Sequence, residues 1–468
     1  MPDAAFDYDL IAIGSGPAGQ RAAVQAAKLG LRAAVVEKAR CVGGVCVDTG
    51  TIPSKTLREA VIFLTGTGGV QDPRRRLRTE GRPSAEQLLS RVEDVVTRER
   101  AVIEDQLQRN DVTLLGGEAS FVDPHRLQIL GNGNGTQIVS AARIVIAVGT
   151  RPAAPPGVPA DGEVVITSDD VTRMKKLPRS LAVVGAGVIG VEYASMFAAL
   201  GVSVTLIESR DRPLEFLDRE IVDELLHQMR SRNVTFRLGE AVASIAVEAN
   251  PTPRAVLLLE SGKRIVSDVV LFSAGRVSAT DRLNLSAAGL HADERGRLKV
   301  DETFCTTVPH IFAAGDVIGY PSLAATSSEQ GRLAACHAFG VEAGPISPHF
   351  PFGIYAVPEI SMVGPTEQDL TRDHVPYETG MARYREIARG QILGDDSGLL
   401  KMIFHREDRR LLGVHAIGTG ATELIHIGQA VMAHSGGMSF FLQNVFNYPT
   451  LAECYKVAAL DASNKLRR

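Results

Sequence analysis

The chain has 468 residues, of which 45% are hydrophobic and 22% are charged, and this length suits about three domains of ~150 residues each. Its net charge is −4, with both signs interspersed, which argues against nucleic acid or an anionic membrane surface as a partner. No apolar run approaches the roughly 20 residues of a membrane span, and five scattered cysteines indicate a reducing compartment, so we expect a cytoplasmic protein.

The first predicted element is a nucleotide-binding strand, turn and helix at the N-terminus. Three glycines follow the apolar run 10–13, namely Gly14, Gly16 and Gly19. A helix is predicted over 17–29 and a second strand over 33–37, which ends at Glu37. The first glycine permits a tight turn, the second lets a pyrophosphate approach the backbone, and the third lets the helix pack on the strand. A carboxylate at the end of the second strand accepts hydrogen bonds from the hydroxyls of an adenosine ribose.

Residues 43–55 follow, and they read Gly-Gly-Val-Cys-Val-Asp-Thr-Gly-Thr-Ile-Pro-Ser-Lys. This loop is typical of flavin-dependent reductases, but it holds one cysteine, Cys46, where a redox-active disulfide needs two. Farther along, an amphipathic pattern predicts a long helix over 84–109. A glycine-rich turn over 131–135 and a strand over 144–148, which ends at Gly149, complete the first unit.

A proline-rich boundary with Pro152, Pro155, Pro156 and Pro159 precedes a second fingerprint. Its glycines, which follow the strand predicted over 181–184, are Gly185, Gly187 and Gly190. The next strand, over 202–207, is followed by Glu208, which suits a nucleotide with a free 2′-hydroxyl. Arg210 and Arg212 come directly after it, and a guanidinium suits the 2′-phosphate of NADP, so both NAD and NADP stay open as ligands.

The strand predicted over 311–314 is followed directly by a glycine, Gly315, and then by Asp316, as strands of the first unit are followed by glycines. We therefore expect the second domain to be inserted into the first. The predicted architecture is α/β, with two dinucleotide-binding domains and a C-terminal α+β domain. The domains are predicted as 1–152 together with 277–347, then 153–276, then 348–468. Four histidines of the last part have no metal-ligand spacing, so we expect no metal.

With these motifs the chain resembles the pyridine nucleotide-disulfide oxidoreductase family over essentially its whole length. The resemblance rests on residues 50–55, 186–195, 315–321 and 446–450. It implies two Rossmann-like domains, with FAD at the first and NAD or NADP at the second, and a homodimer or larger homo-oligomer formed by 348–468. The implied FAD-binding residues are Gly14, Gly16, Gly19, Glu37, Lys55, Gly149 and Asp316. The implied nicotinamide nucleotide-binding residues are Gly185, Gly187, Gly190, Glu208, Arg210 and Gly275.

The same resemblance implies two catalytic residues, Lys55 and Glu192. Lys55 would lie near flavin N5, oriented by Glu192, and Asp316 would bind the flavin ribitol. A cation beside N5 stabilises a reduced, anionic flavin electrostatically.

Two departures from the family pattern bear on the reaction. The disulfide-reducing members have cysteines at the positions of Cys46 and Thr51, and they have a histidine base at the position of Tyr448. A phenol with a pKa near ~10 is a poor base at neutral pH. Cys41 restores a five-residue separation from Cys46, but it precedes the double glycine, which is the wrong register for the family's pair. Glu453, whose natural histidine partner is absent, is interpreted as structural.

Without a disulfide, the reduced flavin can pass its hydride only to an acceptor that reaches it directly. We therefore predict a ping-pong transhydrogenation in which NADPH reduces FAD and NAD+ reoxidises it, or the reverse, with one site serving both nucleotides. Three alternatives stay open: an NAD(P)H dehydrogenase that reduces quinones, a dihydrolipoamide-dehydrogenase-like enzyme that uses Cys41 and Cys46, and a non-catalytic redox sensor.

Overall fold

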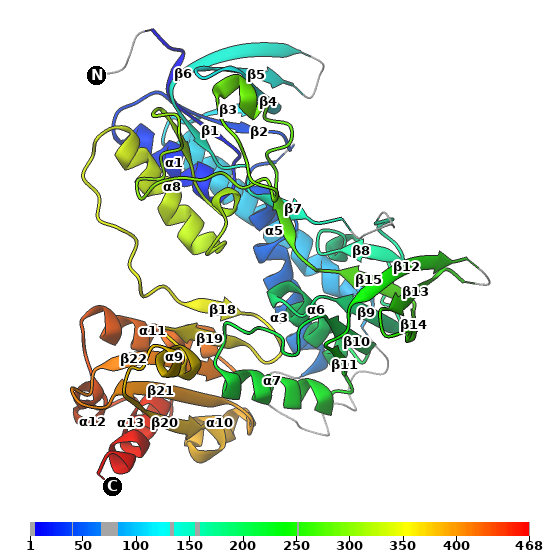
Figure 1. Ribbon diagram of the computed structural model, residues 1–468, viewed down its shortest axis with the longest axis vertical. Coiled ribbons are helices and arrows are strands. Elements are labelled where there is room, and N and C mark those ends of the chain that lie inside the picture. The colour runs from blue at the N-terminus through cyan, green and yellow to red at the C-terminus, as the bar shows by residue number, and fades with distance from the viewer. Residues whose placement is uncertain are drawn as a thin grey trace. The chain divides into compact units, whose positions relative to one another are not determined.

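The computed structural model describes residues 5–39, 41–66, 83–131, 135–154, 160–249 and 252–467 (Figure 1). The chain folds into two compact units, each assembled from separated segments. The first unit comprises Met1–Thr56, Leu89–Ala153 and Gly275–Ile346. The second comprises Leu57–Leu88, Ala154–Ala274 and Ser347–Arg468. Pro155, Pro156, Pro159 and the middle of the glycine-rich turn, 132–134, lie outside the described residues.

The first unit is built on a seven-stranded sheet of order β3-β2-β1-β6-β5-β4, in which β17 also pairs with β6. Its strands are β1 (Tyr8–Ile13), β2 (Ala33–Glu37), β3 (Thr113–Gly116), β4 (Glu118–Asp123), β5 (Arg126–Leu130), β6 (Thr136–Ile146) and β17 (Ile311–Ala313). Strands β1, β2, β3, β17 and the second half of β6 are parallel, whereas β4, β5 and the first half of β6 form an antiparallel meander. The chain returns to this sheet at β17, where Ile311 pairs with Ile144. This agrees with the resemblance of the segment 311–315 to the glycine-ended strands of the first unit.

The helices of the first unit connect these strands. They are α1 (Pro17–Lys28), α2 (Gly44–Asp48), α5 (Ala85–Gln108, which begins in the second unit), α8 (Ala324–Ala338) and the short helices η2 (Leu285–Ala288) and η3 (Asp316–Ile318). Helix α3 (Thr51–Thr65) begins in the first unit and ends in the second. Helices α1 and α8 pack closely: a Cβ at Gly331 would lie only 2.0 Å from the carbonyl oxygen of Ala18. A small two-stranded sheet of β7 (Thr150–Pro152) and β16 (Arg276–Ser278) completes the unit.

The second unit repeats the parallel architecture in a five-stranded sheet of order β11-β10-β9-β15-β8. Its strands are β8 (Val165–Thr167), β9 (Ser180–Val184), β10 (Ser203–Glu208), β11 (Thr235–Leu238) and β15 (Val269–Phe272). Strand β9 is buried over its apolar run, as a parallel strand covered on both faces requires. The other elements are η1 (Val171–Arg173), α6 (Val188–Ala199), α7 (Arg219–Ser231) and an antiparallel sheet of β12 (Val242–Glu248), β13 (Arg254–Leu259) and β14 (Arg264–Ser267).

The C-terminal part of the second unit is an antiparallel sheet of order β18-β19-β22-β21-β20 with helices. Its strands are β18 (Phe352–Ile354), β19 (Ile360–Val363), β20 (Tyr377–Arg383), β21 (Leu399–His405) and β22 (Leu411–Ile417). Its helices are α9 (Glu367–Arg372), η4 (Tyr384–Glu386), α10 (Ala388–Leu393), α11 (Ala421–Ala433), α12 (Met438–Gln443) and α13 (Glu453–Lys465). The core here contains Tyr384, Phe404, Phe441 and Tyr455, each fully buried. The predicted α/β architecture with a C-terminal α+β part is confirmed.

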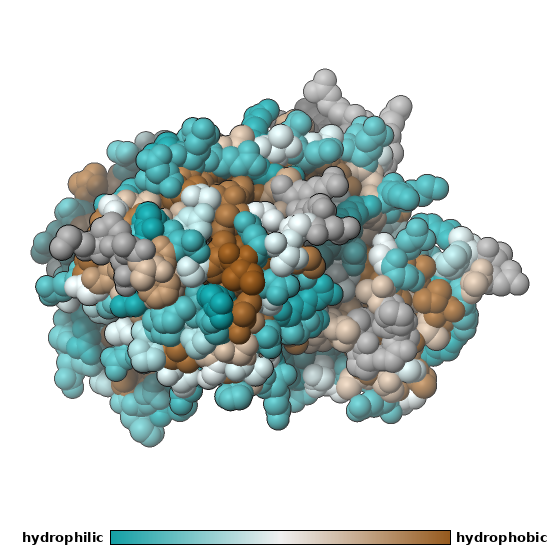
Figure 2. Space-filling view, turned by 90° about the horizontal axis from the view of Figure 1, so that it is seen from above, coloured by the Kyte–Doolittle hydropathy of each residue, from teal (hydrophilic) through white to brown (hydrophobic). Residues whose placement is uncertain are grey.

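Figure 2 shows hydrophilic residues over much of one face, interrupted by a narrow hydrophobic band. Among the helices of the described residues, none combines the length and the apolar character that crossing a bilayer requires.

Candidate nucleotide sites

The first glycine loop joins β1 to α1. Gly14 has a φ of +105°, a conformation that side chains disfavour, and a Cβ at Gly19 would lie 1.8 Å from the carbonyl oxygen of Gly14. The close contact lets the helix start directly above the strand. The N-cap of α1 is Gly16, so no side chain caps the first turn. This helix start therefore leaves room and amide donors for an anion.

Glu37 organises the loop, because both of its oxygens accept hydrogen bonds. Its Oε2 accepts from the backbone N of Ser15 at 3.0 Å and from the Ser15 hydroxyl at 2.5 Å, and its Oε1 accepts from the backbone N of Ala39 at 2.8 Å. The carboxylate is buried. The Ser15 hydroxyl in turn accepts from the backbone N of Gly43 at 2.9 Å, so this network ties the fingerprint to the double-glycine loop.

Asp316 begins η3 in the same unit, and two residues from elsewhere in the chain lie beside it. Thr150 donates to Asp316 at 3.4 Å, and Arg276 donates through Nε to the Thr150 hydroxyl at 2.8 Å and through Nη2 to its carbonyl at 2.9 Å. Burial raises the pKa of Asp316, although Arg276 and the hydroxyls of Thr150 and Ser327 oppose that rise. Sequence reasoning missed Arg276; its position directly after Gly275, at the end of a predicted strand, was the available signal.

The segment around Cys46 contains a break between two helices. Cys46 lies in α2, and Thr51 is the first residue of α3. The Thr51 side chain lies near enough to the thiol of Cys46 to affect its pKa. Burial raises the pKa of the Cys46 thiol, and the carboxylates of Asp316 and Glu99 raise it further, against the opposing effects of the Thr51 side chain and of Lys55. Cys41 and Cys46 are free thiols in the structure.

The second glycine loop joins β9 to α6 and repeats the first in detail. A Cβ at Gly190 would lie 1.9 Å from the carbonyl oxygen of Gly185 and 2.8 Å from the Ser273 hydroxyl. A Cβ at Gly187, by contrast, would meet no heavy atom within 4 Å. Gly187 is the N-cap of α6, which has no side-chain cap, so this helix start also suits a phosphate.

Glu208, the last residue of β10, is buried beside this loop. Its Oε2 accepts from the backbone N of Ala186 at 2.7 Å, and Arg210 reaches both carboxylate oxygens, with Nε at 3.0 Å from Oε1 and Nη2 at 3.1 Å from Oε2. Burial raises the pKa of Glu208, but the hydrogen bonds from Arg210 and Ala186 prevail and lower it to about 2. Arg212 forms an ion pair with Asp223 of α7 instead.

Glu192 lies in α6 and is almost fully buried. Its Oε1 accepts a hydrogen bond from the backbone N of Tyr355 at 2.8 Å. One turn farther, the Ser195 hydroxyl accepts from the backbone N of Val357 at 3.0 Å, so α6 is bonded twice to the segment before β19. Lys55 is half-buried in α3 and belongs to the other unit, and the predicted orientation of Lys55 by Glu192 stays a prediction.

The remaining predicted positions lie at strand ends. Gly149 lies between β6 and β7 with a φ of +62°, and Gly275 lies between β15 and β16 with a φ of +122°.

Tyr448, at the position of the family's histidine, is 74% exposed. In the part of the chain that the structure describes, no donor reaches the buried Oε2 of Glu453.

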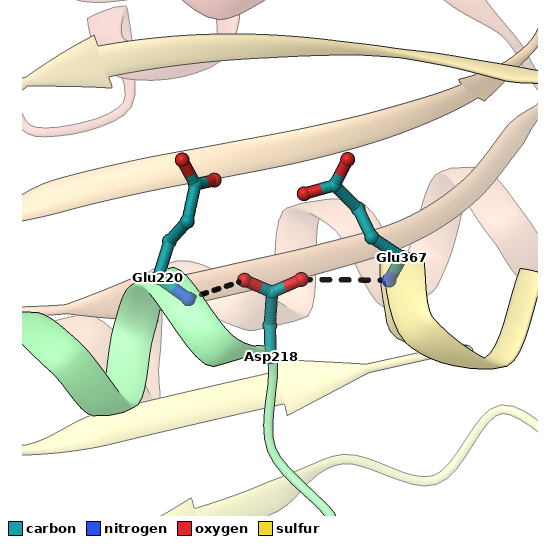
Figure 3. Close-up of side chains that lie close together, drawn as sticks. All are labelled: Asp218, Glu220 and Glu367. Atoms are coloured by element: carbon teal, nitrogen blue, oxygen red, sulfur yellow. Dashed lines mark hydrogen bonds between the residues drawn. The ribbon is translucent and has the colours of Figure 1, made fainter. Parts of the chain in front are cut away.

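Three carboxylates elsewhere in the second unit come close enough to resemble a metal site. They belong to Asp218, Glu220 and Glu367, and Asp218 also accepts from the backbone N–H groups of the other two, at 3.1 and 3.4 Å (Figure 3). The cation they hold is the ammonium of Lys401, a fully buried residue of β21. Its Nζ lies 2.9 and 3.0 Å from the two oxygens of Asp218 and 2.6 Å from Glu220, and it also contacts Glu367. Burial alone would lower the pKa of Lys401, but the three carboxylates raise it.

Comparison with known proteins agrees with this geometry. The chain is 52% identical over 462 residues to the soluble pyridine nucleotide transhydrogenase of Mycobacterium tuberculosis (strain ATCC 25177 / H37Ra), covering 98% of each chain. It is 44% identical over 464 residues to the protein of that name from Photobacterium profundum, again covering 98% of each. Among solved structures, LpdA from Mycobacterium tuberculosis matches with a TM-score of 0.88 and 27% identity, covering 96% of this chain and 99% of that one.

A flavoprotein disulfide reductase of Escherichia coli that HOCl induces, RclA, matches with a TM-score of 0.87 and 27% identity, covering 97% of this chain and 99% of that one. Two family models account for most of the sequence. Residues 8–331 match the pyridine nucleotide-disulphide oxidoreductase model, and residues 350–459 match the dimerisation domain of the same family. The resemblance inferred from the glycine loops is thus confirmed: the chain belongs to the pyridine nucleotide-disulphide oxidoreductase family.

Proposed function

We propose that the chain is an FAD-dependent oxidoreductase, a soluble pyridine nucleotide transhydrogenase that moves a hydride between NADPH and NAD+. The observation that carries the proposal is the residue at position 51: Thr51 begins α3 where the disulfide-reducing members of the family have their second cysteine. The place of the family's second thiol is taken by a hydroxyl, which cannot form a disulfide, in a chain that retains both glycine loops. The names of the relatives that match over the full length support the same activity.

The residues of the first unit fit FAD. The uncapped start of α1 offers amide donors to the pyrophosphate, and the glycine backbone leaves it room to approach. Glu37 accepts three hydrogen bonds from the protein, and a carboxylate has about four acceptor positions, so it retains capacity for a ribose hydroxyl. Asp316 would hold the ribitol, and Gly149 would face the cofactor from the end of β6.

The residues of the second unit fit a nicotinamide nucleotide. Gly185, Gly187 and Gly190 would shape the loop for its pyrophosphate, and Glu208 with Arg210 would face the adenosine ribose. Gly275, which the family resemblance also implies for this nucleotide, is the first residue of the last segment of the first unit. When bound, FAD supplies the hydride chemistry by accepting two electrons from one nucleotide and passing them to another. Lys55 supplies a positive charge for the catalytic step, and Glu192 positions that lysine.

Cys46 takes no part in electron transfer in this proposal. Burial raises the pKa of its thiol, which disfavours the thiolate that a nucleophile requires. The exposed Tyr448 stands at the position of the histidine base that a dithiol cycle needs, and it does not serve as that base. The two losses agree, because the base has no function without the thiol pair.

The function is tested by anaerobic hydride transfer from NADPH to thio-NAD+ with purified, FAD-loaded protein. We expect turnover with ping-pong kinetics, that is, parallel lines in double-reciprocal plots. Flavin that NADPH reduces but thio-NAD+ does not reoxidise would reject the proposal, and turnover with a quinone in the same assay would then favour the dehydrogenase alternative.

The absence of dithiol chemistry leads to a second prediction, for Thr51→Cys. Residues 46 and 51 stand at the positions of the family's two cysteines, so we expect a disulfide between them, with about two extra electrons per flavin in an anaerobic dithionite titration. Disulfide reductase activity with lipoamide should nevertheless stay at the background level, because Tyr448 does not serve as the base. Thr51→Ser is the matched control and should titrate as the wild type does. Efficient lipoamide reduction by the cysteine variant would contradict the role given to Tyr448.

The assembly and location are parts of the same proposal. The match of residues 350–459 to the dimerisation domain supports a homodimer. Five free cysteines support a cytoplasmic location, and the three-domain division at residues 152, 276 and 347 stays a prediction.

A further inference from the structure

The carboxylate of Glu208, which would bind the ribose hydroxyls of a nucleotide, is already paired with Arg210. Five donors from the protein reach this carboxylate: the backbone N–H groups of Ala186 and Arg210, the Ser209 hydroxyl, and the Nε and Nη2 of Arg210. A carboxylate offers about four acceptor positions. A ribose hydroxyl can therefore bind Glu208 only when the Arg210 side chain moves away from it.

Movement of this kind is confined to side chains. The backbone around residues 208–210 is bonded to the neighbouring loop, with the N of Glu240 donating to the carbonyl of Glu208 at 2.9 Å and the N of Gly239 to the carbonyl of Arg210 at 3.0 Å. The side chain of Arg210 is 47% exposed, whereas that of Glu208 is only 6% exposed. The arginine is thus the partner that can turn.

A second carboxylate, that of Glu215, also lies near the guanidinium of Arg210. Oε2 of Glu215 lies 3.7 Å from Nη1, and its side chain is 55% exposed. Arg212 is not available as an alternative cation, because Asp223 already pairs with it. Glu215 is therefore the acceptor within reach when Arg210 leaves Glu208.

We propose that Glu215 is the alternate partner of Arg210 and so determines which nucleotide the site prefers, an inference that rests on the proposed use of both NAD(H) and NADP(H). With NAD(H), Arg210 turns to Glu215 and Glu208 accepts from the ribose hydroxyls. With NADP(H), Arg210 turns to the 2′-phosphate and neutralises its charge beside Glu208. The guanidinium of Arg210 thus has three acceptors, Glu208, Glu215 and the 2′-phosphate, and the bound nucleotide determines which of them it pairs with.

The test is the binding of 2′,5′-ADP and 5′-AMP to the FAD-loaded protein by titration calorimetry, since these fragments differ only in the 2′-phosphate. In Glu215→Gln, Arg210 loses its alternate partner. We expect 2′,5′-ADP to bind about threefold more tightly and 5′-AMP about threefold more weakly, as the loss of an exposed ion pair implies. Glu248→Gln, the matched control, removes one carboxylate from the exposed ion pair of β12 with Arg264 and should change neither affinity by more than about 1.5-fold.

The opposite directions distinguish exchange from plain charge removal, which would tighten both fragments together. Adding Glu215→Gln to Arg210→Gln should have no further effect, because the exchanging group is already gone. Equal changes for both fragments, no change, or an effect that persists without Arg210 would each overturn the proposal. Failure of thio-NAD+ reduction by the wild type would reject the proposed function instead, whatever the fragments do.

Discussion

Lys401→Met is expected to lower the free energy of unfolding by about 3–5 kcal/mol, because it leaves three carboxylates around a buried site without their cation. Methionine nearly preserves the length of the side chain and removes the charge. Asp218 suffers most: it is fully buried, and it also accepts from the first turns of α7 and α9. The loss should therefore loosen both helix starts together with β21.

The measurement is thermal unfolding of the FAD-loaded protein by circular dichroism, with an expected fall in Tm of roughly 5–10 °C. Lys465→Met is the matched control. That lysine forms an exposed ion pair with Asp461 at 2.8 Å, and its removal should cost no more than about 0.5 kcal/mol. A Lys401→Met protein that melts within ~1 °C of the wild type would show that the cluster contributes nothing to stability.

Gly190→Ala should slow reduction of the flavin by NADPH roughly 100-fold while FAD stays bound. The new methyl group would lie 1.9 Å from the carbonyl oxygen of Gly185, and that oxygen is backbone, so α6 must move away from β9. Displacement of the helix start by about 1 Å misaligns the phosphate donors, and such an error costs roughly 100-fold in rate. Anaerobic stopped-flow absorbance of the flavin measures this rate directly.

Gly187→Ala separates misfolding from poor binding. This alanine meets no protein atom within 4 Å, and the φ of −73° suits any residue, so Tm should be unchanged. In the proposed site the methyl group would face the pyrophosphate, and we expect the apparent Kd for NADPH to rise about tenfold. An unaltered Kd in Gly187→Ala would mean that the nucleotide does not cross this loop. Wild-type rates in Gly190→Ala would mean that the helix tolerates the shift.

Local patterns in the sequence predicted the elements around both loops to within one or two residues. The helix predicted over 17–29 is α1, the one over 84–109 is α5, and Glu37 and Glu208 each end a strand as expected. These predictions hold because glycine geometry and apolar periodicity act over a few residues. The helix break between α2 and α3 was not predicted, because it depends on a bond from the backbone N of Gly50 to the carbonyl of Val45.

The sequence by itself determined the family, the α/β architecture and the missing second thiol, since each of these is written in contiguous motifs. Only the tertiary structure decided how distant charges pair. Lys401 reads as one lysine in an apolar strand, yet it meets Asp218 across 183 residues of chain. Likewise, the sequence predicts Arg210 as a phosphate ligand, and only the folded loop shows that it pairs with Glu208 and that Glu215 lies beside it. Electrostatic contacts of this kind depend on distances of a few ångströms between segments, which no local pattern encodes.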